Sequence, residues 1–457
     1  MIEKRAILPM LAAVLAFALS PAGRVSAQVP NGEQANGLTV FAAVRRALDV
    51  HPTVRRAEAD YDAARATARA SRAAYFPTLQ LAGTLTRYEK PMVVTPLHGL
   101  SAGQFPEFDR TLLQGGLRLG FLVFDGPGRS ARVRQSSAEA HVADVATRGV
   151  AQALIAQTVT AYLGVQSRRE ILDAHRHRVL AFEAELARVS QLQKVGQVAD
   201  VDVLRIEAVL AAAGADLVSN SEMADLATRD LARLVDLSVE SLGAEGLLPL
   251  RLFDSTVGTK DELMQEARKS SPELERARWQ TGAASAARSV ARGGRWPQLK
   301  AAANYLGFDS PDVQGAYEWN AGLELTFPLF TGGAIAAAMA RASARERAAA
   351  EDERRIELQV DQAVDMALSA IRQARARAVS LARAVDRYAE VARIEKLLLE
   401  SGTGTQTDYL DSRADLLTAQ AGLVEARHQV IEAEVDLAKV TGILSLGWLE
   451  GKLEHTQ

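Results

Sequence analysis

The chain has 457 residues, a formal net charge of −3, no cysteine, and 5% aromatic against 48% hydrophobic residues. The near-neutral charge argues against nucleic acid as a partner, because nucleic acid would require a basic face. The absence of cysteine excludes disulfides, thiol catalysis and cysteine-based zinc sites. With so few aromatics, alanine and leucine supply most of the apolar surface, which suits long, closely packed helices better than a thick globular core.

The N-terminus has the order of a secretory signal peptide. Lys4 and Arg5 precede a short apolar stretch at 6–19, and small residues at 25–27 form a cleavage pattern. Residues 1–27 are therefore predicted to be removed, the alternative being a buried N-terminal helix. No later segment approaches the roughly 20 apolar residues of a membrane helix, so a membrane span would have to consist of strands.

A helix is predicted next, over residues 40–73, and Pro77 follows its end because a ring without an N–H cannot continue a helix. Two strands follow near 78–88 and 113–123, joined by a loop at 89–112. In the first strand leucines alternate with polar residues, which are Leu79, Leu81 and Leu85 against Gln80, Thr84 and Thr86.

The chain then continues into a very long helix. Residues 129–192 contain no proline and carry apolar residues at i+3 and i+4 spacing, which predicts one helix on the order of 100 Å long. Its apolar stripe is narrow, so it must pack side by side with other helices, as in a coiled coil. A turn at Gly196 leads to a second helix near 199–235, which returns antiparallel.

The second half of the chain repeats this order. Pro52 and Pro77 recur as Pro272 and Pro297, both at an offset of 220 residues. Two unrelated helical domains would not hold such a register, so we interpret the chain as an internal duplication.

After the strands the offset falls to 206, so the first copy carries 14 extra residues in its strand loop. The constant offset pairs Gly196 with Gly402 and Asp202 with Asp408. The predicted organisation is a signal peptide at 1–27, repeat one at 28–235, a connector at 236–258, repeat two at 259–442 and a tail at 443–457.

In the second copy the helix is expected over 260–293, with a capping box of Thr259 and Glu262. The strands follow near 298–308 and 316–327, the long helix over 334–399 and the return helix over 406–441. One face of the last strand is apolar and the other polar, with Trp319, Ala321, Leu323, Leu325 and Phe327 against Glu318, Asn320, Gly322, Glu324 and Thr326. This alternation fits a lipid-facing barrel strand or a half-exposed strand of a soluble sheet.

Four strands cannot close a barrel, and every lipid-exposed sheet edge must be paired. Twelve strands, four from each chain of a trimer, could close one. This is the physical reason to expect a homotrimer.

At this point the sequence resembles the TolC family of outer-membrane efflux channels over residues 40–442. The matching marks are the aromatic–proline pairs that end the first helices, the segment Phe-Pro-Leu-Phe-Thr-Gly-Gly at 327–333, and Gly402-Thr403 followed by the segment 408–411. The resemblance implies an α+β membrane channel, with a trimeric 12-stranded outer-membrane β-barrel and an α-helical barrel of long hairpins across the periplasm.

The resemblance also implies the function and the partners. The trimer would sit in outer-membrane lipid and serve as the exit duct of a tripartite efflux or type I secretion system. A periplasmic adaptor (membrane fusion) protein would join it to an inner-membrane RND or ABC pump. Such a channel is not an enzyme and needs no cofactor.

The candidate gate lies at the helical turns. Asp408 and Asp411 are three residues apart and share a helix face. The resemblance implies that they line the periplasmic tip as two stacked acidic rings, which would favour cations. The alternative is that both are helix-start acids stabilised by the macrodipole. Asp202 and the turn glycines Gly196 and Gly402 are the remaining predicted residues of the pore and gate.

This chain departs from the family pattern at the tip. The resemblance implies that Asp202 takes part in links that hold the tip closed. The family channels carry an aromatic residue and an arginine where this chain has Leu399 and Gly404, so the same closing links cannot form. Arg205, one turn after Asp202, offers another partner, or is a solvated surface charge.

A periplasmic coiled-coil adaptor or scaffold without a membrane span is the alternative function. It would share the signal peptide and the helical hairpins, but it would not need paired strand hairpins. An enzyme is disfavoured because the sequence contains no Gly-rich phosphate loop, HExxH or GxSxG motif. No catalytic, cofactor-binding or metal-binding residue is predicted.

Overall fold

The fold is known from a computed structural model that describes residues 37–98, 103, 105–252, 257–312 and 315–455. The predicted signal peptide at 1–27 lies outside these residues. The helices and strands all belong to one compact unit, Leu38–Gln457.

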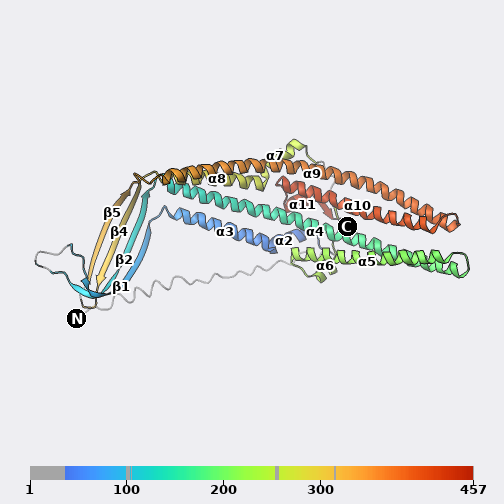
Figure 1. The fold of residues 1–457 in the computed structure, drawn as a ribbon, viewed down its shortest axis with the longest axis horizontal. Helices are drawn as coiled ribbons and strands as arrows, with labels where there is room; N and C mark the ends of the chain where they lie inside the picture. The colour runs from blue at the N-terminus through green and yellow to red at the C-terminus, as the bar shows by residue number, and fades with distance from the viewer. Residues whose placement is uncertain (1–36, 99–102, 104, 253–256, 313–314, 456–457) are drawn as a thin grey trace. The chain divides into compact units, whose positions relative to one another are not determined.

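The two halves of the chain have the same order of elements (Figure 1). The first half consists of α2 (Val40–Val50), α3 (Pro52–Ala73), β1 (Thr78–Val93), β2 (Phe108–Phe124), α4 (Gly128–Lys194) and α5 (Asp200–Val235). The second half consists of α7 (Lys260–Ser270), α8 (Pro272–Gly293), β4 (Gln298–Asp309), β5 (Ala316–Thr326), α9 (Ala334–Ser401) and α10 (Gln406–Val440).

The first helix of each copy is broken, so the prediction of single helices over 40–73 and 260–293 was wrong. His51 and Ser271 have extended backbone, with ψ of 129° and 120°. The cause is the following proline, which disfavours helical backbone in the residue before it and is itself suited to the first turn of a new helix. The predicted capping box is confirmed, since Thr259 N donates to Glu262 Oε2 at 2.9 Å and Glu262 N donates to Thr259 Oγ1 at 3.4 Å.

The four long strands form one antiparallel sheet in the order β1-β2-β4-β5. The loop predicted at 89–112 is shorter than expected because β1 and β2 continue past a register shift, with Met92 opposite Asp109 and Val93 opposite Phe108. The hairpins of the two copies are joined through β2 and β4, which leaves β1 and β5 at the edges of this sheet.

The long helices are confirmed. Helix α4 has 67 residues and α9 has 68, so each is about 100 Å long. Each forms an antiparallel hairpin with the helix that follows it, and α4 also packs against α3, α8 and α10.

Among the described helices, none is both long enough and apolar enough to cross a membrane.

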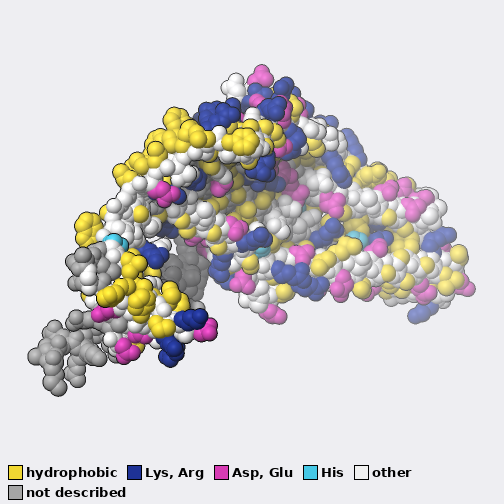
Figure 2. All heavy atoms as spheres, turned by 60° about the vertical axis from the view of Figure 1, so that its left-hand side comes forward, with side chains coloured by type: hydrophobic (Ala, Val, Ile, Leu, Met, Phe, Trp, Pro, Cys, Tyr) yellow, Lys and Arg dark blue, Asp and Glu magenta, His cyan; other side chains and the backbone are white. Residues whose placement is uncertain are grey.

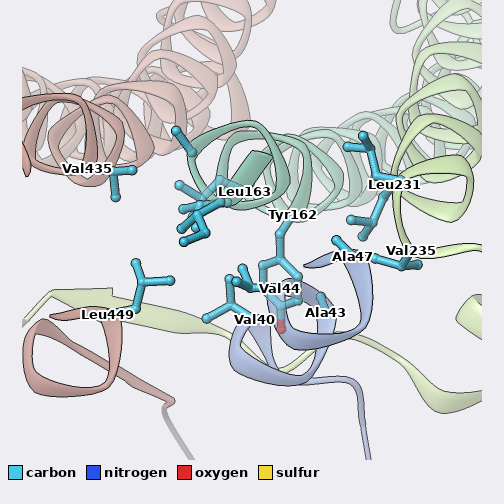
Figure 3. Close-up of a cluster of buried hydrophobic side chains, with 14 of the residues drawn as sticks. Val40, Ala43, Val44, Ala47, Tyr162, Leu163, Leu231, Val235, Val435 and Leu449 are labelled. Atoms are coloured by element: carbon cyan, nitrogen blue, oxygen red, sulfur yellow. The ribbon is translucent and has the colours of Figure 1, made fainter. Parts of the chain in front are cut away.

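The largest buried cluster lies part-way along the long helices and is not symmetric between the copies. We call it the mid-shaft core (Figure 3), and its members include Val40, Val44, Tyr162, Leu163, Leu231, Val235, Val435 and Leu449. The corresponding cluster of the second copy is smaller, being built around Ala267, Leu274, Val360 and Val364.

The connector and the C-terminal tail complete the mid-shaft core. The connector forms α6 (Val239–Glu245) and β3 (Leu250–Leu252), and the tail forms α11 (Leu446–Lys452) and β6 (Leu453–His455). Strands β3 and β6 pair antiparallel, and α11 packs against α2. Both segments therefore cover the first copy.

Tyr162 joins the connector to the long helix. Its hydroxyl lies 2.7 Å from the carbonyl oxygens of Leu38 and Leu248, and a phenol can donate its one proton to either. Burial raises the pKa of Tyr162, so the hydroxyl stays protonated. The equivalent position in the second copy is Leu368, which has no hydroxyl to hold a second connector.

Candidate functional site

One face of the four-stranded sheet is apolar and exposed. Residues directly opposite one another on antiparallel strands share a face, so the pairings place Leu81, Leu117, Tyr305 and Trp319 in one row across the sheet. Figure 2 shows hydrophobic side chains gathered along the strands. The exposed members of this apolar sheet face are Leu79, Leu81, Leu85, Leu113, Leu117, Leu119, Tyr305, Tyr317, Trp319, Leu323 and Leu325.

The opposite face of the sheet is polar. The neighbouring row consists of Gln80, Arg118, Asn304 and Asn320. Asn304 Nδ2 donates to Asn320 Oδ1 at 2.7 Å, which links β4 to β5 on this side. An apolar and a polar face on strands of this length suit a wall between lipid and water.

The strand–helix junctions are held by specific contacts. Arg129 Nη1 donates to the carbonyl of Leu122 at 2.7 Å, and its guanidinium lies 4.5 Å above the Tyr75 ring. Asp125 is 5% exposed and pairs with Arg132 at 2.7 Å. These contacts fix the start of α4 relative to the end of β2.

At the far end of the hairpins, the two predicted glycines make the turns. Gly196 has a φ of 75° and Gly402 a φ of 76°, the left-handed backbone that follows many helices and favours glycine. Gly402 N donates to Leu399 O at 3.1 Å, which closes the end of α9. The structure therefore gives both glycines a turn-forming role.

Asp408 is both exposed and part of the start of α10. Thr405 Oγ1 donates to Asp408 Oδ2 at 2.6 Å, and Asp408 N lies 3.2 Å from the same hydroxyl. This is the geometry of a helix-start acid, the alternative that the sequence left open. Asp411 follows almost one turn later and is also exposed, so both carboxylates lie on the surface of the tip.

Arg205 connects the two copies at the tip. Its Nη1 lies 3.7 Å from Asp202 Oδ1 and donates to Thr407 Oγ1 at 2.8 Å. Arg205 therefore pairs with Asp202, which was one of the two interpretations of the sequence, the other being a solvated surface charge. It also reaches from α5 to α10.

A second polar link lies beside it and was not predicted. Gln406 Nε2 donates to Glu185 Oε1 at 3.1 Å, and Arg188 Nε donates to Glu185 Oε2 at 3.0 Å. Burial alone would raise the pKa of Glu185, but the hydrogen bonds from Arg188 and Gln406 and the charge of Lys396 hold the pKa below its ordinary value. Glu185 is thus a carboxylate that the tip keeps ionised.

Apolar packing supports these two links. Leu410 of α10 is 5% exposed and packs with Phe182, Val189 and Ile206 of the first copy. The two hairpins of one chain therefore meet at the tip through both an apolar cluster and the links of Arg205 and Glu185.

A sequence signal for these links exists in the broken equivalence of the copies. At the offset of 206, Glu185 corresponds to Val391, Arg188 to Ile394, and Arg205 to Asp411. Where a charged residue in one copy corresponds to an apolar or oppositely charged residue in the other, a contact that only one copy makes is indicated.

Long helical hairpins joined to a sheet with an apolar exposed face indicate a membrane protein. A sequence model of the family described as "Outer membrane efflux protein" matches residues 43–235 and 263–443. The chain belongs to this family, which confirms the resemblance to TolC-like channels and places the protein in the outer membrane, extending into the periplasm.

Individual relatives agree with this assignment. The chain is 26% identical over 419 residues to outer membrane protein OprJ of Pseudomonas aeruginosa, covering 90% of this chain and 84% of the relative. It is 24% identical over 355 residues to outer membrane efflux protein BepC of Brucella suis, covering 76% of each. Its fold is similar to that of the CmeC outer membrane channel of Campylobacter jejuni, with a TM-score of 0.77, 15% identity, and coverage of 95% and 96% of the two chains.

Proposed function

We propose that three copies of this chain form an exit duct that carries solutes from the periplasmic side to the exterior. The observation that carries the proposal is the apolar sheet face, whose strands β1 and β5 leave two edges unpaired within the described sheet. Unpaired backbone groups are too costly in lipid for such edges to remain open.

Pairing between chains resolves both edges at once. If β1 of one chain pairs with β5 of the next chain, three chains give a closed barrel of twelve strands, wide enough for a channel. The polar row around Arg118 and Asn304 then faces the interior, and the apolar sheet face contacts lipid.

The duct is proposed to work with other proteins. The helical hairpins would extend through the periplasm to an adaptor (membrane fusion) protein, which joins them to an inner-membrane RND or ABC pump in a tripartite efflux or type I secretion system. Membership of an efflux family supports this arrangement. The chain itself would catalyse no reaction, because selection and energy coupling belong to the pump.

The oligomer tests the proposal against the alternative of a periplasmic adaptor or scaffold. A barrel trimer should require detergent for extraction from outer membranes, and it should migrate on SDS gels as a trimer unheated and as a monomer after boiling. Extraction by salt alone, or a monomer in both lanes, would contradict the duct and favour the scaffold.

The gate is proposed to lie at the tip, where Asp408 and Asp411 of three copies would form two acidic rings. Asp202 and Arg205 would hold the two helical hairpins of each chain together below the rings. The turns at Gly196 and Gly402 would end the duct. The exposure of both α10 carboxylates supports the rings, because charges paired within one chain could not serve an incoming ion.

Replacing both ring residues, as Asp408→Ala with Asp411→Ala, is expected to weaken block by multivalent cations at least about tenfold. Each carboxylate–cation contact at an exposed site contributes on the order of 1 kcal/mol, and a ring places several around one ion. Single-channel recordings in planar bilayers, with a trivalent cation on the tip side, measure the effect together with cation selectivity.

A matched control is Glu222→Ala with Asp225→Ala, an exposed acidic pair with the same spacing on α5, remote from the tip. The control pair should leave block and selectivity at the parent values. Unchanged block in the Asp408 and Asp411 variant would exclude the rings.

A further inference from the structure

Arginines are concentrated at the four junctions between strands and helices. The segments 69–77, 124–137, 290–297 and 327–341 together contain eight arginines, no lysine and one carboxylate, Asp125. The tip segment 390–415 has the opposite balance, with six carboxylates against two arginines and one lysine. The arginine excess is therefore a local property of the strand end.

Two of the eight arginines stabilise the junction itself. Arg129 donates to backbone carbonyls and Arg132 pairs with Asp125, as described above. The other six are exposed, and their guanidinium groups form no ion pair or hydrogen bond with another residue in the part of the chain that the structure describes. We call these six the arginine collar, and its members are Arg69, Arg72, Arg134, Arg292, Arg295 and Arg341.

The collar lies at the edge of the apolar sheet face. Arg72 is in the last turn of α3, six residues before β1 begins, and Arg292 is in the last turn of α8. Arg341 lies about 10 Å along α9 from its start, at 1.5 Å per residue. Figure 2 shows Lys and Arg side chains directly beside the hydrophobic band of the strands.

Exposed aromatic side chains occupy the same junctions. Phe76 is 70% exposed, Trp296 is 48% exposed and Phe330 is 90% exposed. Aromatic residues of barrel proteins collect where hydrocarbon meets headgroups. The headgroup layer on each side of a bilayer is only about 5–8 Å thick, so arginines one to two turns beyond these aromatics lie within reach of lipid phosphates.

We propose that the arginine collar binds the phosphate groups of anionic phospholipids in the periplasmic leaflet of the outer membrane. The inference rests on the proposed function, since it requires the apolar sheet face to lie in lipid. The guanidinium fork matches two phosphate oxygens, which an ammonium does not. The near absence of carboxylates at the junctions leaves the collar free for an external anion.

Native mass spectrometry of the purified full-length protein tests the proposal. The protein is titrated in detergent with phosphatidylglycerol or with phosphatidylcholine, and the retained lipids are counted. The test variant is R69Q/R72Q/R292Q/R295Q. The control is R229Q/R372Q/R383Q/R387Q, four exposed arginines on the helical shaft that likewise lack a partner among the described residues.

The parent should retain phosphatidylglycerol in preference to phosphatidylcholine, and the test variant should bind phosphatidylglycerol at least about fivefold more weakly. One arginine near an anionic surface contributes about this factor. The control variant should match the parent. If the fourfold variant does not assemble, R72Q/R292Q with R383Q/R387Q as its control takes its place.

Three results would overturn the proposal. They are a parent without preference for phosphatidylglycerol, a test variant that retains it as the parent does, and a control variant that loses it equally. Retention by the test variant would mean that these arginines face the lumen or another chain. Equal loss by the control variant would mean a general effect of charge. Failure of the proposed function would appear differently, as a parent chain that does not fractionate with outer membranes as a heat-modifiable trimer.

Discussion

Leu323→Arg is expected to abolish assembly of the protein in the outer membrane. Leu323 is 72% exposed and lies on the apolar sheet face, with Ala321 and Leu325 on the same side of β5. An arginine on the lipid face costs up to about 2–4 kcal/mol, the upper values applying at the middle of the bilayer, and a trimer would carry three. The fraction of heat-modifiable trimer in detergent-extracted outer membranes measures the loss.

The neighbouring residue provides the control because its side chain points to the other face. Gly322 lies on the polar side of β5 opposite Ala302, and a Cβ added there meets no atom within 4 Å. Gly322→Arg should therefore assemble much as the parent does. If both variants assemble equally well, the apolar sheet face does not contact lipid. If both fail equally, the strand tolerates no arginine and facing is not the cause.

Local periodicity made the strands and long helices predictable. The alternation that separates Trp319 from Asn320 was readable in the sequence, and the pairing rows of the sheet bear it out. The i+3 and i+4 stripes likewise predicted α4 and α9 to within about two residues of each end. Each of these signals depends only on neighbours along the chain.

Features that depend on a competing local rule or on a distant partner were not predictable from this periodicity. The breaks at His51 and Ser271 follow from the proline after each, a rule that helical periodicity obscured. The pairing of β3 with β6 joins segments about 200 residues apart. No short pattern in either segment indicates the other.

The candidate site divides in the same way. Gly196 and Gly402 were identifiable because a left-handed turn favours glycine, and both stand at helical turns. The link of Glu185 to Gln406 was missed because it joins different copies through side chains, and propensity says nothing about such contacts. Comparison of the two copies could have indicated this link, because equivalent positions that differ in charge show where the two copies make different contacts.

The unequal copies lead to the second large effect, expected for Leu449→Ala. Leu449 is fully buried in the mid-shaft core, where α11 packs on α2. Truncating a buried leucine to alanine costs about 2–5 kcal/mol, depending on how far the site can collapse. The matched control is Leu397→Ala on α9, where the side chain is 51% exposed and the change should be small.

The location of the damage separates a specific loss from general unfolding. The tail covers α2 of the first copy, whereas α7 of the second copy packs on α9 with a cluster that contains no tail residue among those described. Hydrogen exchange should therefore accelerate in α2, β3 and β6, while α7 keeps the protection of the parent. Equal acceleration in α2 and α7 would mean that the tail stabilises the whole shaft. Unchanged exchange in α2 would mean that the first copy holds its mid-shaft core without the tail.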